Sequence, residues 1–196
     1  VNENMPVCFG GTEEGVHISH VDMIVEGDNP AIAEMGGAAA ASDVDEAVAK
    51  LILEEIPDGA TLQLGIGAVP EAVGTALRDK HDLGIHTEML GNAMINLIRS
   101  GAVTNRRKTL HPGKTVCTFS LGDEDALDFL ANTPDILFRP AAYTNHPATI
   151  ARNENMVSVN TALQVDLLGQ VSSETIGSRQ YSGTGGALDF AYGAHS

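Results

Sequence analysis

The sequence predicts an open α/β fold with a mainly parallel sheet and flanking helices. Between residues 42 and 152, short apolar segments of strand length alternate with segments of helical period. Aromatic residues make up only 4% of the chain against 43% hydrophobic residues, so the core must consist mostly of aliphatic side chains. A glycine turn at Gly65–Gly67 separates an expected strand from an expected helix. This alternation implies right-handed crossovers between parallel strands.

The first 41 residues carry only weak structural signals. Val16–Ile18 and Met23–Glu26 have the composition of short strands. Gly36, Gly37 and the alanines after them are typical of a flexible connector. Both ends of the chain look cut, since it begins at Val1 and ends within an apolar element. We therefore expect residues 1–41 to be the end of a preceding domain with its linker. Residues 42–196 would be a C-terminal domain, truncated at its end.

The first strand and helices of that domain have clear boundaries. Ser42 is placed to cap a helix whose first turn is acidic, and the turn at residues 57–59 ends it. Thr61–Leu64 is a short strand. After the Gly65–Gly67 turn, Pro70 suits the first turn of a helix that reaches about Leu77.

The same order of strand and helix then repeats. The expected elements are a strand over Leu83–Met89, a helix over Asn92–Ser100, a strand over Thr115–Leu121, a helix over Asp123–Ala131, a strand over Ile136–Phe138 and a helical turn over Pro147–Arg152. Consecutive strands are expected at Val157–Asn160 and Leu163–Leu167, followed by a polar, glycine-rich loop at Gly177–Gly186.

Charge and composition argue against several functional classes. The formal charge of −15 disfavours nucleic acids and anionic membranes as partners, and the basic cluster Arg106–Lys108 fits a solvated loop. Neither a membrane-spanning run nor a signal peptide is visible. Cys8 and Cys117 have no metal-like spacing and are expected to be reduced thiols of a cytoplasmic protein. His17 and His20 are the only closely spaced histidines, so no metal site is expected.

Glu88 is the first candidate for chemistry. It stands at an expected strand-to-helix turn, where open α/β folds usually place their active sites. A carboxylate beside glycine loops, whose N–H groups can stabilise an oxyanion, can attack an activated acyl group. His86 precedes it by two residues and would either tune the carboxylate or be structural. Pro70 breaks the dinucleotide-binding pattern GxGxxG, and no GxSxG serine motif is present.

Three ordered stretches of the chain resemble the acetyl-CoA hydrolase/transferase family, and within it the 4-hydroxybutyrate and butyrate–acetate CoA-transferases. They are Gln63–Val73, His86–Met89 and Tyr181–Phe190, and the resemblance extends over nearly the whole chain. It implies a class I CoA-transferase-like domain of the NagB/RpiA type, carrying the nucleophile. The earlier domain would be largely missing.

The resemblance also implies a mechanism. Glu88 would attack the acyl-CoA thioester to form an anhydride, and the released CoA would then form a glutamyl-CoA thioester. An incoming carboxylate would take over the CoA, so the kinetics would be ping-pong. Acyl-CoA and a short-chain carboxylate would be the substrates, with no permanently bound cofactor and no metal. The family further implies a homodimer.

Other site residues are carried over from the same motifs. The oxyanion and CoA-binding residues would be Gln63, Gly65, Gly67, Gly183, Gly185 and Gly186. Asn4 and Asn92 are candidates for substrate contact. Asn92 departs from the family pattern as we know it, which commonly has Ser-Asp-Gly where this chain has Gly91-Asn92-Ala93. That difference bears on substrate preference, because it leaves Glu88 unchanged.

Two alternatives stay open from the sequence. An acyl-CoA hydrolase would use the same Glu88 and differ only in letting water resolve the intermediate. An inactive fragment would bind CoA weakly or pair with another chain, and would need the missing N-terminal domain. A nicotinamide-binding domain is disfavoured by Pro70.

Overall fold

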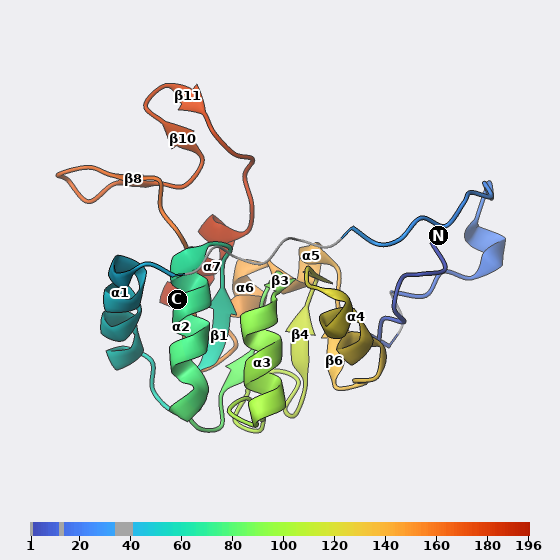
Figure 1. Cartoon of the computed structure of the whole chain (residues 1–196), viewed down its shortest axis with the longest axis horizontal. Coiled ribbons are helices and arrows are strands. Elements are labelled where there is room, and N and C mark those ends of the chain that lie inside the picture. The colour runs from blue at the N-terminus through green and yellow to red at the C-terminus, as the bar shows by residue number, and fades with distance from the viewer. Residues whose placement is uncertain (1, 12–13, 34–40) are drawn as a thin grey trace.

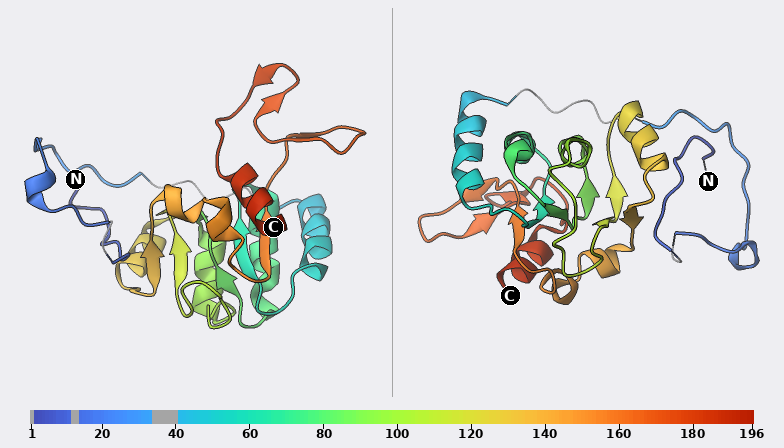
Figure 2. Two further views of the ribbon diagram at one scale, coloured as in Figure 1. Left: turned by 180° about the vertical axis from the view of Figure 1, so that it is seen from behind. Right: turned by 90° about the horizontal axis from the view of Figure 1, so that it is seen from below.

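Short parallel strands between two layers of helices form the body of the molecule. The computed structural model describes residues 2–11, 14–33 and 41–196. One layer holds α1 (Asp43–Glu54), α2 (Ala68–Ala76), α3 (Asn92–Ser100) and α4 (Glu124–Ala131), and the other holds α5 (Ala141–Thr144), α6 (Pro147–Ile150) and α7 (Ala187–His195) (Figures 1 and 2). The predicted fold class, an open mainly parallel α/β sheet with flanking helices, is confirmed.

The sheet is parallel wherever its main strands pair. β1 (Thr61–Leu64) lies between β2 (Gly84–Ile85) and β7 (Met156–Val159). β4 (Thr115–Cys117) pairs with β6 (Ile136–Phe138), and a bridge between His86 and Val116 joins the two groups of strands. A shorter parallel pair joins β3 (Met89–Leu90) to β5 (Phe119–Ser120). The carboxyl ends of these strands therefore meet at one edge.

Two long predicted strands are each divided in the structure. The strand expected over Leu83–Met89 appears as β2 and β3, and the one over Thr115–Leu121 as β4 and β5. The division has a backbone cause. The carbonyl oxygen of Glu88 accepts hydrogen bonds from the N–H groups of both Thr118 and Phe119, which interrupts the regular ladder. Glu88 therefore lies at an irregular point of the sheet rather than inside a strand.

The strands predicted near the N-terminus are absent. Val16–Ile18 and Met23–Glu26 are assigned to no strand, and a 3-10 turn, η1, covers Ile18–His20. Apolar runs of this length need a neighbouring strand to satisfy their backbone groups, and none of the described residues pairs with them. The expected connector after Gly36 lies almost wholly outside the described residues.

An arm of two hairpins projects from the body, where the sequence predicted one strand and a loop (Figure 1). β8 (Gln164–Val165) pairs antiparallel with β9 (Val171–Ser172), and β10 (Thr175–Ile176) with β11 (Arg179–Gln180). The loop expected over Gly177–Gly186 therefore contains a strand. The arm leaves the end of β7 and returns to the body at α7, so it starts and finishes beside the carboxyl edge of the sheet.

Local capping explains where several helices begin. Ser42 and Asp45 form a reciprocal capping box at the start of α1, as the acidic first turn predicted. Asp123 accepts a hydrogen bond from the N–H of Ala126 at the start of α4. Gly67 precedes α2 without any side-chain cap. The first N–H groups of α2, which lie beside the predicted glycine turn, are therefore not capped by a side chain.

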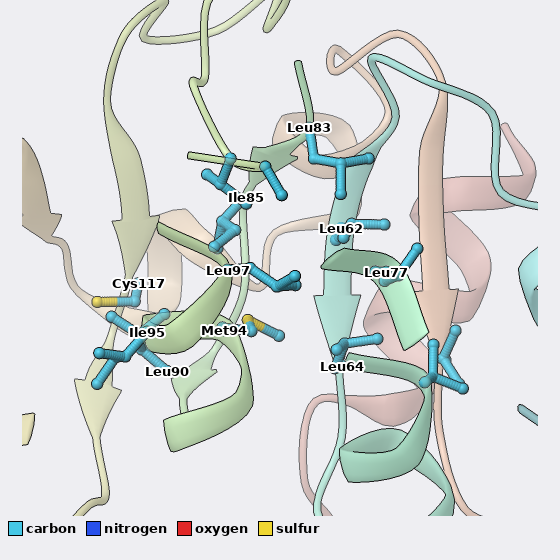
Figure 3. Packing of buried hydrophobic residues seen from close by; sticks show 14 of the residues in the cluster. Leu62, Leu64, Leu77, Leu83, Ile85, Leu90, Met94, Ile95, Leu97 and Cys117 are labelled. Atoms are coloured by element: carbon cyan, nitrogen blue, oxygen red, sulfur yellow. The ribbon is translucent and has the colours of Figure 1, made fainter. Parts of the chain in front are cut away.

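The core lies between β1, β2 and the helices α2 and α3. Most of its buried side chains are aliphatic, as the low aromatic content predicted, and Figure 3 shows Leu62, Leu64, Leu77, Leu83, Ile85, Leu90, Met94, Ile95 and Leu97 packed together. Burial of such side chains is the main contribution that holds strands against helices. Within the described residues, no helix is both long and apolar enough to span a membrane.

Lys108 is a buried cation inside this framework. Its side chain is only 4% exposed, and Nζ donates hydrogen bonds to the carbonyl oxygens of Ile85 at 2.8 Å and Lys114 at 2.7 Å. Burial lowers the pKa of Lys108 to about 7. A neutral amine still supplies both donated protons. The basic cluster predicted as a solvated loop therefore includes one residue that ties β2 to β4.

We expect Lys108→Met to lower the free energy of unfolding by about 2 kcal/mol, because two carbonyl oxygens lose their donor. Urea denaturation at pH 8 would measure the change. Lys50→Met on the exposed face of α1 is the matched control and should shift the free energy by less than about 0.5 kcal/mol. Equal stabilities of the two variants would contradict the structural role of Lys108.

Candidate active site

Glu88 lies at the carboxyl edge of the sheet, between β2 and β3. Its side-chain Oε2 accepts a hydrogen bond of 2.9 Å from the N–H of Gly186, and the side chain is half-buried. β1 pairs in parallel with β2, so Gly65, which follows β1, and the segment that carries Glu88, which follows β2, leave the sheet at the same edge. The three stretches singled out in the sequence therefore converge on this edge of the sheet.

Gly186 approaches Glu88 too closely for any side chain at that position. A Cβ atom on Gly186 would stand 2.4 Å from Oε2 of Glu88 and 2.7 Å from Nδ2 of Asn145. Its backbone, with φ −80° and ψ 0°, is one that any residue adopts. Glycine is therefore required here for space and not for backbone conformation.

Asn145 is a site residue that the sequence reasoning missed. It follows α5 as its C-cap, and its amide lies against Gly186 on the side where the Glu88 carboxylate is held. Its Oδ1 is buried with no hydrogen-bond partner among the described residues. No motif surrounds it in the sequence, and it comes to Glu88 because α6, which follows it, packs against α7. An amide in this position can donate to a carboxylate or to the oxygen of a bound acyl group.

His86 holds the segment that carries Asn145. Its ring is fully buried beside Phe190, and Nε2 donates a hydrogen bond of 2.8 Å to the carbonyl oxygen of Thr144. Burial lowers the pKa of His86 to about 4, so the ring is neutral near pH 7. Neither a hydrogen bond nor an ion pair joins His86 to Glu88. Of the two roles left open by the sequence, this geometry favours the structural one.

The buried histidine makes stability depend on pH. Its folded pKa of about 4 lies below the ordinary value of 6.5, so between those values the unfolded chain binds a proton that the folded chain does not. Stability from His86 is complete above pH 6.5 and falls by up to about 1.4 kcal/mol per pH unit as the pH drops toward 4. Burial of Lys108 adds a slope of the same sign near and above pH 7, because its folded pKa is about 7. The part of the slope that belongs to His86 is therefore read from its loss in a His86 variant.

We expect His86→Gln to lose most of this slope, since an amide can still donate to Thr144 but does not titrate. The measurement is the free energy of unfolding in urea at several values between pH 7 and pH 4.5. His146→Gln, at an exposed position before α6, is the control that keeps the slope. An unchanged slope in His86→Gln would show that the histidine is protonated in the folded chain as well.

The Gly65–Gly67 turn, which follows β1 at the same edge of the sheet, has free backbone donors. The N–H of Gly65 is engaged, donating to the carbonyl oxygen of Val159 at 2.8 Å. The N–H groups of Ile66 and Gly67 donate to no acceptor among the described residues. Gly67 has φ of 130°, which glycine adopts without strain. The N–H groups in this turn that remain available to a ligand are therefore those of Ile66 and Gly67.

Gln63 does not point into the site as the sequence led us to expect. Its side chain is 5% exposed and hydrogen-bonded to Ser158 and Asn160 of the neighbouring strand end. Direct contact with CoA would require breaking those bonds. The signal that the sequence reasoning missed is that Gln63 belongs to a buried strand, whose polar side chains must find partners.

The remaining predicted residues lie in different places. Gly183 and Gly185 are exposed beside Gly186, with open space where a side chain would be. Asn92 begins α3, and its amide donates toward Asp123 at 3.3 Å and not toward Glu88. Asn4 donates to the carbonyl oxygens of Asn29 and Pro30 and lines a groove against α4, so the structure does not bring it to Glu88.

No metal-ligand cluster of histidine, cysteine or acidic side chains occurs among the described residues. Cys8 and Cys117 are free thiols, and burial raises the pKa of both. The chemistry that the site can perform therefore depends on one carboxylate and the backbone and amide donors around it.

Two CoA-transferases are similar to this chain over its whole length. It is 51% identical to a butyryl-CoA:acetate CoA-transferase of Anaerostipes caccae and 45% identical to a 4-hydroxybutyrate coenzyme A transferase of Clostridium kluyveri. Each match covers 100% of this chain and 44% of the relative. The chain thus spans less than half the length of these relatives. Acetyl-CoA hydrolases are more distant, as the 28% identity to the protein of Candida albicans illustrates.

Solved structures agree with the sequence matches. RipA from Yersinia pestis superposes with a TM-score of 0.88 at 45% identity, over 99% of this chain and 43% of that one. A 4-hydroxybutyrate CoA-transferase from Porphyromonas gingivalis gives a TM-score of 0.84 at 38% identity, over 99% and 45% of the two chains. Residues 122–196 match the acetyl-CoA hydrolase/transferase C-terminal domain. The chain belongs to the acetyl-CoA hydrolase/transferase family.

Proposed function

We propose that this chain carries the nucleophile of a CoA-transferase that moves CoA between a short-chain acyl-CoA and a small carboxylate. Acetyl-, butyryl- and 4-hydroxybutyryl-CoA are the proposed donors, in keeping with the transferases that the chain resembles. The observation that carries the proposal is the Glu88 carboxylate, held by the N–H of Gly186 beside the free N–H groups of the Gly65–Gly67 turn.

The first half of the reaction uses Glu88 as a nucleophile. A carboxylate oxygen of Glu88 attacks the thioester carbon, the C–S bond breaks and CoA leaves as a thiolate. The thiolate then attacks the Glu88 carbonyl of the resulting anhydride and releases the original acyl group as a carboxylate. The product is a glutamyl-CoA thioester. Activation is conserved at each step, so neither ATP nor a permanently bound cofactor is required.

Backbone donors would stabilise the charge that develops during these steps. The N–H groups of Ile66 and Gly67, which have no acceptor among the described residues, would meet the oxygen of the substrate carbonyl, and that of Gly186 donates to Glu88. Gly183 and Gly185 leave room for the CoA chain to pass close to the backbone. In the second half, an incoming carboxylate attacks the glutamyl-CoA thioester, and the same steps run in reverse.

Mass spectrometry of the full-length protein tests the proposal. Incubation with acetyl-CoA followed by hydroxylamine should convert the Glu88 side chain to a hydroxamate, located by peptide fragmentation. Borohydride should reduce the same thioester to an alcohol. The Glu88→Gln variant should show neither product. A wild-type protein that consumes acetyl-CoA without modification at Glu88 would overturn the assignment.

Hydrolysis is the second candidate for the same site. Water in place of a carboxylate would resolve the glutamyl-CoA thioester, and distant hydrolases of the family include the protein of Candida albicans. The greater similarity to transferases favours transfer. Product analysis with and without added butyrate separates the two: a transferase forms butyryl-CoA, whereas a hydrolase releases free CoA at a rate that butyrate leaves unchanged.

The proposal also covers the domain organisation, the oligomeric state and the cellular location of the protein. We place the catalytic domain at residues 42–196 and the end of a preceding domain with its linker at residues 1–41. A homodimer in the cytoplasm is proposed as well. The free thiols fit a reducing compartment, and the charge of −15 disfavours nucleic-acid and anionic-membrane partners. The exposed half of the site would be closed by the additional sequence that relatives carry, so the 196-residue chain alone would be inactive.

A further inference from the structure

Three polar side chains form a closed hydrogen-bond network directly beneath the Gly65–Gly67 turn. Oε1 of Gln63 accepts from Oγ of Ser158 at 2.6 Å and from Nδ2 of Asn160 at 3.0 Å. Nε2 of Gln63 donates in return to Oδ1 of Asn160 at 2.9 Å. The network joins the ends of β1 and β7, the two parallel strands that reach the carboxyl edge side by side.

The same strand end also holds the glycine turn itself. A Cβ on Gly65 would stand 2.8 Å from Oδ1 of Asn160, and one on Gly67 would stand 3.0 Å from Oγ1 of Thr161. Oγ1 of Thr161 donates to the carbonyl oxygen of Ile66 at 3.1 Å, and the N–H of Gly65 donates to Val159. The turn therefore packs against residues 159–161. The N–H groups of Ile66 and Gly67 take no part in these contacts.

The buried amide of Gln63 needs partners, and the contact of Asn160 with Gly65 ties those partners to the glycine turn. Asn160 is exposed, and its amide would find water as a partner if it were not bound to Gln63. Within the network Gln63 is buried, Ser158 is half-buried and Asn160 is exposed, and Asn160 contacts the turn at Gly65. Through the contact of Asn160 with Gly65, the network restrains the backbone of the Gly65–Gly67 turn, which joins β1 to α2.

We infer that Gln63, Ser158 and Asn160 are positioning residues, which fix the Gly65–Gly67 turn so that the N–H groups of Ile66 and Gly67 face the acyl carbonyl under attack by Glu88. This inference rests on the proposed function. It replaces the direct ligand contact expected for Gln63 with an indirect role. Small displacements of catalytic donors lower rates strongly because their stabilisation depends on distance and angle.

The test is the single-turnover rate of Glu88 acylation in the full-length protein, measured by rapid quench with acetyl-CoA and mass spectrometry. Asn160→Ala and Ser158→Ala should each slow acylation by about tenfold to a hundredfold. The Km for acetyl-CoA should stay within about twofold of wild type, because the donors act mainly on the transition state. The double variant should be no slower than the slower single variant, since the residues act as one unit.

Matched variants separate positioning from loss of folding. Ser158→Thr keeps the hydroxyl donor and should restore most of the rate. Asn132→Ala, at the C-cap of α4, removes an exposed asparagine away from the turn and should leave acylation unchanged. Rates within about twofold of wild type in both alanine variants, or fully additive losses, would overturn the inference. Failure of wild type to label Glu88 would instead overturn the proposed function.

Discussion

Glu88→Gln is expected to lower the rate of CoA transfer by about 10⁴-fold or more, the scale seen when the nucleophile of an enzyme is removed. Glutamine has the same shape and can still accept a hydrogen bond from the N–H of Gly186. It lacks the anionic oxygen that attacks the thioester, so neither the anhydride nor the glutamyl-CoA thioester can form. The measurement is the initial rate of butyryl-CoA formation from acetyl-CoA and butyrate in the full-length protein.

Two further variants make the result specific to the nucleophile. Glu88→Asp keeps the carboxylate on a side chain that is one methylene shorter, and we expect the rate of CoA transfer to fall by about a hundredfold. Glu154→Gln removes an exposed carboxylate before β7 and should leave the rate unchanged. Substantial transfer by Glu88→Gln, beyond what slow deamidation to glutamate explains, would assign the chemistry to another residue.

Gly186→Ala is expected to lower the rate by about a hundredfold or more, comparable with removal of one oxyanion donor. The added methyl group would stand 2.4 Å from Oε2 of Glu88, so the carboxylate or the backbone of α7 must move. Either movement breaks the 2.9 Å hydrogen bond from the Gly186 N–H. Alanine is compatible with the backbone angles at this position, which confines the effect to the contact with Glu88 and Asn145.

A glycine in open surroundings provides the control for this substitution. Gly27 has no atom within 4 Å of a Cβ position and does not have a left-handed backbone, so Gly27→Ala should leave the rate unchanged. Circular dichroism and thermal unfolding should show Gly186→Ala folded. A Gly186→Ala protein with wild-type kinetics would mean that the Glu88 carboxylate takes another position in the working enzyme.

Much of the scaffold around the site was predictable because its signals are local. The helices over residues 43–54, 92–100 and 124–131 have apolar residues at helical spacing, and the first and third of them also have capping side chains at their N-terminal ends. β1 is a short apolar run between turn residues, and its bounds were predicted to the residue. Because these helices alternate with strands, the parallel sheet followed as well.

The elements that were predicted wrongly depend on partners distant in sequence. Val16–Ile18 has a strand-like composition but lacks a neighbouring strand among the described residues. The strand predicted over Leu83–Met89 is divided because the carbonyl oxygen of Glu88 accepts hydrogen bonds from the N–H groups of Thr118 and Phe119. The hairpins of the arm consist of strands only two residues long, too short to produce a readable alternation.

The sequence by itself determined the fold class and marked Glu88 and the glycine turns, because composition, period and motif order are properties of the linear chain. Only the tertiary structure decided which groups surround the carboxylate. Asn145 comes to Glu88 through the packing of α6 against α7, and the side chain of Gln63 is bonded to Ser158 and Asn160. Hydrogen bonds between side chains so far apart in sequence form only once folding has brought their strands and helices together, and no local pattern records them.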